Sequence, residues 1–188
     1  VWSGPMVGQI LADLGAQVIK IESHGRFDLY RTRGLENERG QMPESTRIES
    51  SQQFHSLNRN KIGMTLDLKQ DAGLAIARQL AGESDVLIEN FTVGTMARLG
   101  LGPGVLAEAN PALVQLSMSG PGKGSSVQEL RSYGLVLSAL GGVEALIRDG
   151  EEFLGSPTFS LSDPNAAAFG AMAALAGALA AKVGGSGS

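Results

Sequence analysis

Cysteine is absent from the 188 residues of this chain, and histidine occurs only twice, as His24 and His55. Without cysteine there can be no disulfide, no thiolate nucleophile and no cysteine-ligated zinc or iron–sulfur site. Two histidines cannot form a three-histidine metal centre. The sequence therefore predicts no metal site, and the lack of cysteine fits a reducing, cytoplasmic setting.

Positive charge is also scarce, because 15 Lys and Arg stand against 19 Asp and Glu, a net charge of −4. Nucleic acids and anionic membranes need clustered positive charge, so we expect neither as a partner. A bilayer span needs about 20 strongly apolar residues. The longest uncharged stretch, residues 166–181, is mostly Ala and Gly. It predicts a buried helix, and we expect no membrane segment.

Glycine is abundant, at 26 of 188 residues, while 43% hydrophobic and 18% charged residues are typical of a folded domain. We expect a single segment over residues 1–188, interrupted by a long polar loop at residues 23–56 that has no clean periodicity. The chain opens where a preceding strand would be expected and closes in a Gly/Ser run. The fold is therefore expected to be incomplete at both ends.

Helical and strand patterns alternate along the rest of the chain. Helices are predicted at residues 5–14, 71–80, 104–109, 135–140 and 164–182, and strands at residues 17–21, 62–66, 86–88 and 113–118. This alternation predicts an α/β fold with a doubly wound, mostly parallel, Rossmann-like sheet. Ligands of such sheets bind outside the carboxyl ends of the strands.

The most chemical feature is Asp163-Pro164, directly before the Ala-rich helix. Asp at the N-cap followed by Pro is a common helix start and stabilises a helix by about 1 kcal/mol. The same place favours a negative charge, and a carboxylate can act as a nucleophile. From these residues, Asp163 can be either a helix-capping residue or a catalytic nucleophile.

Two other places at strand ends are candidates for ligand contact. Asn90 and Phe91 follow the compact apolar run at residues 86–88, although a turn-forming Asn and a core Phe explain them nearly as well. The Gly-rich turn at residues 119–124 satisfies neither the P-loop nor the dinucleotide-binding spacing. A plain turn is therefore favoured there over a nucleotide site.

Several segments occur in a specific order: Ser3-Gly4-Pro5, then residues 11–22 (LADLGAQVIKIE), 58–61 (NRNK), 66–69 (LDLK), 85–91 (DVLIENF), 98–101 (RLGL) and 110–111 (NP). Together they resemble the family III CoA-transferases of the CaiB/BaiF type, which includes formyl-CoA transferase and L-carnitine CoA-transferase. The resemblance covers essentially the whole chain. It corresponds to the amino-terminal part of the large domain of a longer family polypeptide.

This resemblance implies transfer of coenzyme A from an acyl-CoA to a carboxylic acid through a covalent aspartyl intermediate. The residue that matches the family's nucleophile is Asp163. Coenzyme A is then a substrate, and no metal, redox group or tightly bound cofactor is implied. Family members are interlocked homodimers whose closing loop lies in the carboxyl-terminal part, so residues 1–188 alone are expected to be inactive.

The resemblance also assigns CoA contacts to Leu66, Asn90, Phe91, Arg98, Arg131 and Tyr133. Four positions depart from the family pattern: Trp2 replaces a glutamine that helps to hold the acyl group, Ser23 a CoA-binding arginine, Pro121 an aromatic and Gly134 an acidic residue. Trp2 and Gly134 are therefore candidates for the substrate pocket. Trp2 favours a larger or more apolar acyl group.

Two alternatives stay open beside the transferase. A related racemase branch removes a proton next to the thioester with a His–Asp pair, but Tyr133 occupies the matching His position, and the reaction needs a base. A non-catalytic CoA-binding or interaction module is the other alternative, because Trp2 and Gly134 depart from the family pattern.

Overall fold

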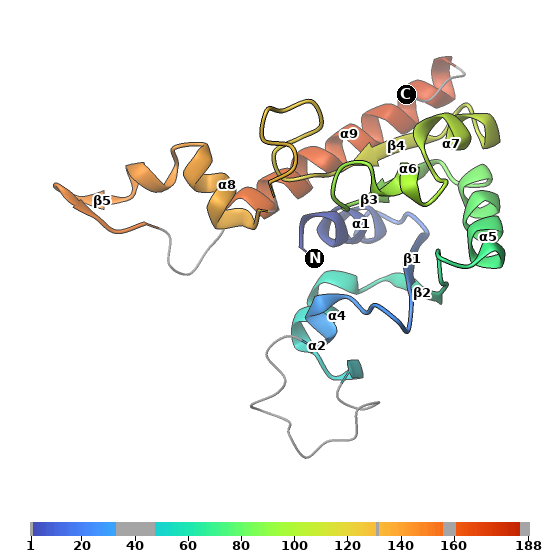
Figure 1. Cartoon of the computed structure of the whole chain (residues 1–188), viewed down its shortest axis with the longest axis horizontal. Helices are drawn as coiled ribbons and strands as arrows, with labels where there is room; N and C mark the ends of the chain where they lie inside the picture. Colours follow the sequence, from blue (N-terminus) through green and yellow to red (C-terminus); the bar gives the residue numbers. More distant parts are fainter. Residues whose placement is uncertain (1, 33–47, 131, 156–160, 185–188) are drawn as a thin grey trace.

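The computed structural model describes residues 2–32, 48–130, 132–155 and 161–184. Helices and strands alternate along them (Figure 1). The helices are α1 (Ser3–Asp13), α2 (Leu29–Thr32), α4 (Gln52–Asn58), α5 (Asp71–Gly82), α6 (Thr95–Arg98), α7 (Pro103–Ala109), α8 (Gly134–Leu140), the short 3-10 helix η1 (Glu144–Leu146) and α9 (Ser162–Gly184). The strands are β1 (Val18–Glu22), β2 (Lys61–Thr65), β3 (Val86–Glu89), β4 (Val114–Ser117), β5 (Arg148–Asp149) and β6 (Glu152–Phe153).

The strands form two parallel pairs and one antiparallel pair. β1 pairs with β2 in a register that places Val18 opposite Lys61, and β3 pairs with β4 with Val86 opposite Val114. The predicted α/β class with parallel strands is confirmed. Within the described residues the two parallel pairs are separate, rather than hydrogen-bonded into one sheet.

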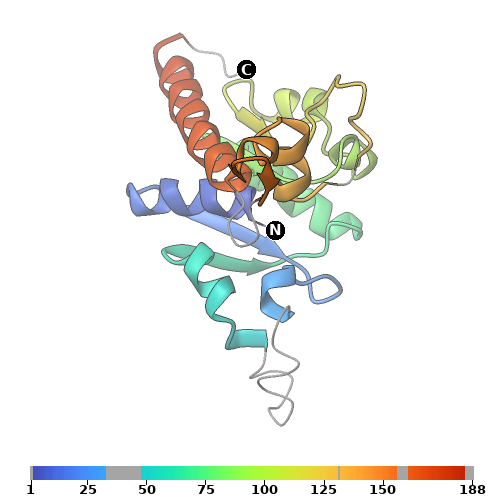
Figure 2. The same cartoon turned by 90° about the vertical axis from the view of Figure 1, so that its left-hand side faces the viewer.

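Helices cover both faces of the β3–β4 pair, as expected for a doubly wound fold. Val86 and Ile88 contact the core cluster of α1 and α9, while Leu87 between them contacts the cluster of α5 and α7. Successive strand side chains point to opposite faces, so this alternation assigns one helical layer to each face. Figures 1 and 2 show α9 beside α1.

The first helix ends as its sequence predicts. Gly15 has a φ of +100°, a left-handed conformation that glycine adopts without strain. The N–H of Gly15 donates to the Ala12 carbonyl, and the N–H of Ala16 donates to the Leu11 carbonyl, both at 3.0 Å. These two bonds form a Schellman motif, which satisfies carbonyls at the helix end and directs the chain into β1.

The long helix α9 is buried on one face only, so the expectation of a buried helix is wrong for its outer face. The inner face is small, with Ala167 and Ala174 fully buried against α1 and β4. The outer face carries large side chains that are 48–83% exposed: Phe169, Met172, Leu175, Leu179 and Val183. Among the described residues, α9 alone is long and apolar enough to cross a membrane by length and composition.

The segment expected to be a long polar loop has local structure where it is described. It contains α2 and α4, and Arg31 joins them to β1. The Arg31 guanidinium forms an ion pair with Glu22 at 3.0 Å and stacks over the Phe54 ring at 3.6 Å from its centroid. Helices of four and seven residues are too short to show a hydrophobic period, which is why the sequence pattern missed them.

Candidate active site

A pocket of about 220 Å³ opens where β3 and β4 end. Its walls come from five places in the chain that are far apart in sequence: the starts of α1 and α9, the ends of β3 and β4, and α8. The described lining residues are Ser3, Asn90, Ser117, Met118, Ser119, Gly120, Gly122, Lys123, Leu137, Ser162, Asp163 and Ala166. The pocket therefore brings Asp163 and Asn90 together, two of the residues predicted from the sequence.

Asp163 lies in the first turn of α9 and is half-buried. The helix begins at Ser162, so Asp163 is already helical and is not the N-cap that the sequence suggested. The difference arises because the Asn165 N–H donates to the Leu161 carbonyl, which starts the helix earlier. Within the described residues the Asp163 carboxylate has no hydrogen bond and no ion pair, so a ligand can reach it.

Asn90 is held in place by bonds to two other parts of the pocket. Its side-chain N–H donates to the Met118 carbonyl at 2.7 Å, and its side-chain oxygen accepts from the Gly4 N–H at 3.3 Å. A Cβ at Gly4 would lie 2.7 Å from the Asn90 Cβ, so the start of α1 can approach only because Gly4 lacks a side chain. Asn90 thus fixes the distance between α1 and the β3–β4 pair.

The other predicted CoA contacts lie outside this pocket. Leu66 follows β2 directly and packs on the α5–α7 cluster. Phe91 follows Asn90 and is 42% exposed, Arg98 ends α6 and is exposed, and Tyr133 precedes α8 and is 65% exposed. Arg131 lies outside the described residues. Leu66 and Phe91 stand just beyond strand carboxyl ends, where ligands of α/β folds bind.

Trp2 and Gly134, the candidate substrate-pocket residues, do not line the pocket but adjoin residues that do. Trp2 directly precedes Ser3. The Ser162 hydroxyl donates to the Gly134 carbonyl at 2.9 Å, which joins the starts of α8 and α9. Their influence on a substrate would therefore act through Ser3 and Ser162.

Several residues that line the pocket do not stand out in the sequence, notably Lys123 and the serines Ser117, Ser119 and Ser162. The glycine spacing of the turn at residues 119–124 fits no phosphate loop and therefore predicts a plain turn. Its position after a parallel strand was the signal that could have identified it, since the carboxyl ends of strands form the binding edge.

The electrostatics of the pocket favour negative charge. Both α1 and α9 begin at its wall, and a helix start carries about half a positive charge. The pocket therefore combines an accessible carboxylate with the positive ends of two helix dipoles, which favour the negative charge that develops during acyl transfer.

Nothing in the described part of the chain groups three or more His, Asp or Glu side chains in a way that could hold a metal ion. Both histidines lie away from the pocket. The His24 ring packs edge-on against Phe27, and His55 Nε2 lies 2.6 Å from the Glu49 carbonyl. The carboxylate of Asp163 is therefore the only titratable acid or base, apart from Lys123, among the described residues that line the pocket.

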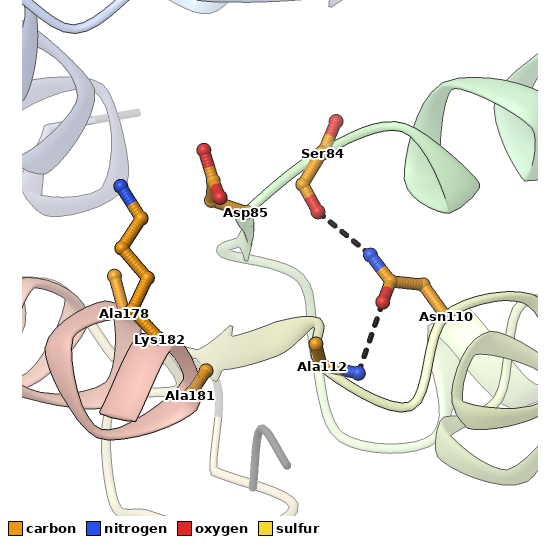
Figure 3. Close-up of a pocket in the computed structure, with 7 residues that line it drawn as sticks. All are labelled: Ser84, Asp85, Asn110, Ala112, Ala178, Ala181 and Lys182. Atoms are coloured by element: carbon orange, nitrogen blue, oxygen red, sulfur yellow. Dashed lines mark hydrogen bonds between the residues drawn. The ribbon is translucent and has the colours of Figure 1, made fainter. Parts of the chain in front are cut away.

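A second, smaller pocket of about 100 Å³ lies at the opposite ends of β3 and β4 (Figure 3). Figure 3 shows Asp85 at the start of β3 and Lys182 on α9 beside it. The Asn110 side chain donates to the Ser84 carbonyl and accepts from the Ala112 N–H, each at 2.9 Å. These bonds use Asn110 for structure, so this pocket offers little free polar chemistry.

Lys61 has the largest change in pKa among the described groups. Its ammonium donates to the Pro5 and Leu57 carbonyls at 2.7 Å and to the Asn58 side chain at 2.9 Å. Burial lowers the pKa of Lys61 from 10.5 to about 8, assisted by the nearby Lys20 ammonium and opposed by the carboxylates of Asp28, Asp13 and Glu22. Lys61 thus connects α1 to α4 at the amino end of β2, away from the pocket.

We expect the free energy of unfolding to rise as pH increases from about 8 to about 10.5. Over this range the unfolded chain holds the Lys61 proton and the folded chain has released it, so higher pH favours folding. Nuclear magnetic resonance of lysine side chains should give a Lys61 midpoint near pH 8. The Lys61→Met variant should lose this part of the pH dependence. A Lys61 midpoint near 10.5 would contradict the prediction.

The whole chain, residues 1–188, matches the family model described as CoA-transferase family III. It is 33% identical over 173 residues to succinyl-CoA–D-citramalate CoA-transferase of Chloroflexus aurantiacus, covering 92% of this chain and 41% of that protein. It is 35% identical over 150 residues to human alpha-methylacyl-CoA racemase, covering 79% of this chain and 33% of that protein.

A crystal structure of a CaiB/BaiF family protein from Brucella suis has a similar fold, with a TM-score of 0.87 and 30% identity over all of this chain. The match covers 48% of that protein. This chain therefore spans less than half the length of each of these three proteins.

Proposed function

The chain belongs to CoA-transferase family III, and on that premise we propose that it moves coenzyme A from an acyl-CoA thioester to a carboxylic acid, with Asp163 as the nucleophile. The observation that carries the proposal is the half-buried Asp163 carboxylate. It lines the pocket and has no partner within the described residues.

In the first half-reaction a carboxylate oxygen of Asp163 attacks the thioester carbonyl carbon. A C–O bond forms, the C–S bond breaks, and the CoA thiolate leaves with the electron pair. The thiolate then attacks the Asp163 carbonyl carbon of the mixed anhydride, which gives an aspartyl-CoA thioester and releases the donor acid.

The second half-reaction reverses these steps with the acceptor. Its carboxylate attacks the aspartyl thioester and again displaces the thiolate, and the thiolate attacks the acceptor carbonyl of the new anhydride. The new acyl-CoA leaves and the Asp163 carboxylate is restored. No oxidant, reductant or net proton transfer is required, so the sequence of steps needs no further base.

The surrounding residues support these steps by position. Each attack forms a tetrahedral oxyanion, which the positive dipole ends of α1 and α9 can stabilise from the pocket wall. Asn90 holds the start of α1 at this place through the Gly4 N–H. Leu66, Phe91, Arg98, Arg131 and Tyr133 are proposed to contact coenzyme A outside the pocket.

Mass spectrometry tests the proposal directly. The whole gene product is incubated with acyl-CoA in the absence of an acceptor acid. The reaction is then quenched and the protein is digested. We expect a CoA adduct on the peptide that contains Asp163, and hydroxylamine should convert that adduct to a hydroxamate. Turnover with an unmodified Asp163 would rule out Asp163 as the nucleophile. Binding of coenzyme A without its exchange between acids would favour a non-catalytic module.

A racemase activity is the second candidate, because alpha-methylacyl-CoA racemase is among the similar proteins. Within the described residues the pocket contains no histidine, and Tyr133 lies outside it. Transferase chemistry is therefore better supported, since the racemase branch uses a His–Asp pair and the described part of the pocket holds Asp163 without a histidine. Incorporation of deuterium at the α carbon without an acceptor acid would instead favour the racemase.

We further propose that the active form is a homodimer and that residues 1–188 alone do not turn over. Length supports the inactivity of residues 1–188 alone, because the similar proteins are more than twice as long as the matched part. The homodimer is supported by the outer face of α9, where exposed large apolar side chains offer a surface for a second subunit.

A further inference from the structure

The pocket beside Asp163 contains one feature that the reaction scheme does not use, the ammonium group of Lys123. Among the described residues that line the pocket, Lys123 is the only cation. Within the described part of the chain its ammonium has no ion pair and no hydrogen bond. The Lys123 ammonium is not paired with any carboxylate of the described residues. It is therefore available to bind an anionic group of a ligand.

The backbone places Lys123 at the apex of the turn that follows β4. Gly122 and Gly124 on either side have φ values of +82° and +84°, a left-handed conformation that other residues rarely adopt. The Gly124 N–H donates to the Gln128 side chain at 3.0 Å, and the Gly122 N–H donates to the Ser119 carbonyl at 3.3 Å. These bonds define the turn, in which Lys123 is exposed and lies at the pocket wall.

We propose that Lys123 binds the distal carboxylate of a short dicarboxylic acid whose other carboxyl group reacts at Asp163. This inference rests on the proposed function. The reacting carboxyl group is uncharged in the thioester and in the anhydride, and therefore needs no lasting counter-ion. The distal carboxylate stays negative in every intermediate, so a cation beside it at the pocket wall stabilises each of them.

The size and polarity of the pocket agree with this class of substrate. Its volume of about 220 Å³ is below the roughly 300–1,000 Å³ that is typical for drug-sized ligands, so it suits a short acid rather than the whole of coenzyme A. Four serines line it together with Asn90. This polar lining favours an acid with a second polar end over the larger apolar acyl group that Trp2 suggested.

The test compares two donors that differ only in the distal carboxylate, succinyl-CoA and butyryl-CoA, in the first half-reaction. The half-saturating donor concentration for formation of the Asp163 adduct is measured by mass spectrometry, with no acceptor present. In Lys123→Met we expect this concentration to rise at least about 10-fold for succinyl-CoA and to stay within about 2-fold for butyryl-CoA. The maximal rate should change little, because the ion pair is equally strong in the ground and transition states.

Two further variants control for charge and position. Lys123→Arg keeps the cation and should restore most of the succinyl-CoA affinity. Lys182→Met removes a lysine at the other end of α9, beside the smaller pocket, and should behave as wild type (Figure 3). Equal effects of Lys123→Met on both donors, or no effect on either, would overturn the inference while adducts still form at Asp163. If neither donor forms an adduct at Asp163, both the inference about Lys123 and the proposed function are overturned.

Discussion

Replacing Asp163 by Asn should lower the rate of CoA transfer by at least about 10³-fold, with little loss of stability. Asn has the same shape, but its amide is a poor nucleophile and cannot form the mixed anhydride. Removing the nucleophile of a covalent mechanism affects kcat far more than binding. The measurement is steady-state transfer between an acyl-CoA and an acid, together with a check by mass spectrometry that the Asp163 adduct is lost.

A matched control exists in the same chain. Asp71 lies in the first turn of α5, as Asp163 lies in the first turn of α9, but it is exposed and away from the pocket. Both Asp71→Asn and Asp163→Asn should cost about 0.3–1 kcal/mol in stability, since each removes a negative charge from a helix start. Only the second should stop transfer. Equal activity of the two variants would show that Asp163 only stabilises the start of α9 and has no catalytic role.

The order of helices and strands could be predicted from the sequence because each long element has its own periodicity. Val86, Leu87 and Ile88 form an apolar run that predicts an inner strand, and the structure covers both of its faces. Gly15 ends α1 as predicted, because a left-handed residue is needed there. Short elements such as α2 and the β5–β6 pair have too few residues to show a period.

The residues that carry the family resemblance are largely structural. Arg59 and Asn60 donate to the Asp13 carboxylate at 2.6 Å and 2.7 Å, and Lys61 donates to the Pro5 carbonyl at 2.7 Å. The hydrogen bond from Arg59 also lowers the pKa of Asp13 below its usual value. These segments hold α1 on the β1–β2 pair, so their order identifies a fold before it identifies a reaction.

The pocket itself could be predicted only in part. Asp163 and Asn90 stand out because a carboxylate before a helix and an amide after a strand are local patterns. Ser162 has no local pattern, and Lys123 has only its place in a turn after a parallel strand. Both reach the pocket only when β4 and α9 pack side by side. Tertiary packing also determines where α9 begins, and it therefore places Asp163 inside the helix.

Gly73 gives the largest expected effect on stability. Intrinsic helix propensity predicts that Gly73→Ala in α5 stabilises the protein by up to about 1 kcal/mol. The structure predicts the opposite sign, because a Cβ at Gly73 would lie 2.0 Å from the Asp67 carbonyl oxygen and 2.9 Å from its carbon. These are backbone atoms, and that carbonyl also accepts from the Gln70 N–H at 3.1 Å. The clash can be relieved only by moving the turn that joins β2 to α5.

We therefore expect Gly73→Ala to lower the free energy of unfolding by about 3 kcal/mol, equivalent to a fall in Tm of roughly 6–12 °C. Thermal and urea unfolding measure both quantities. The control is Gly104→Ala in α7, where a Cβ meets no atom within 4 Å, so propensity alone should act and stability should stay level or rise slightly. Because the displaced turn begins at Leu66, the affinity for coenzyme A should fall together with stability in Gly73→Ala. If both glycine variants were equally stable, the close approach of α5 to Asp67 would not be a constraint on this fold.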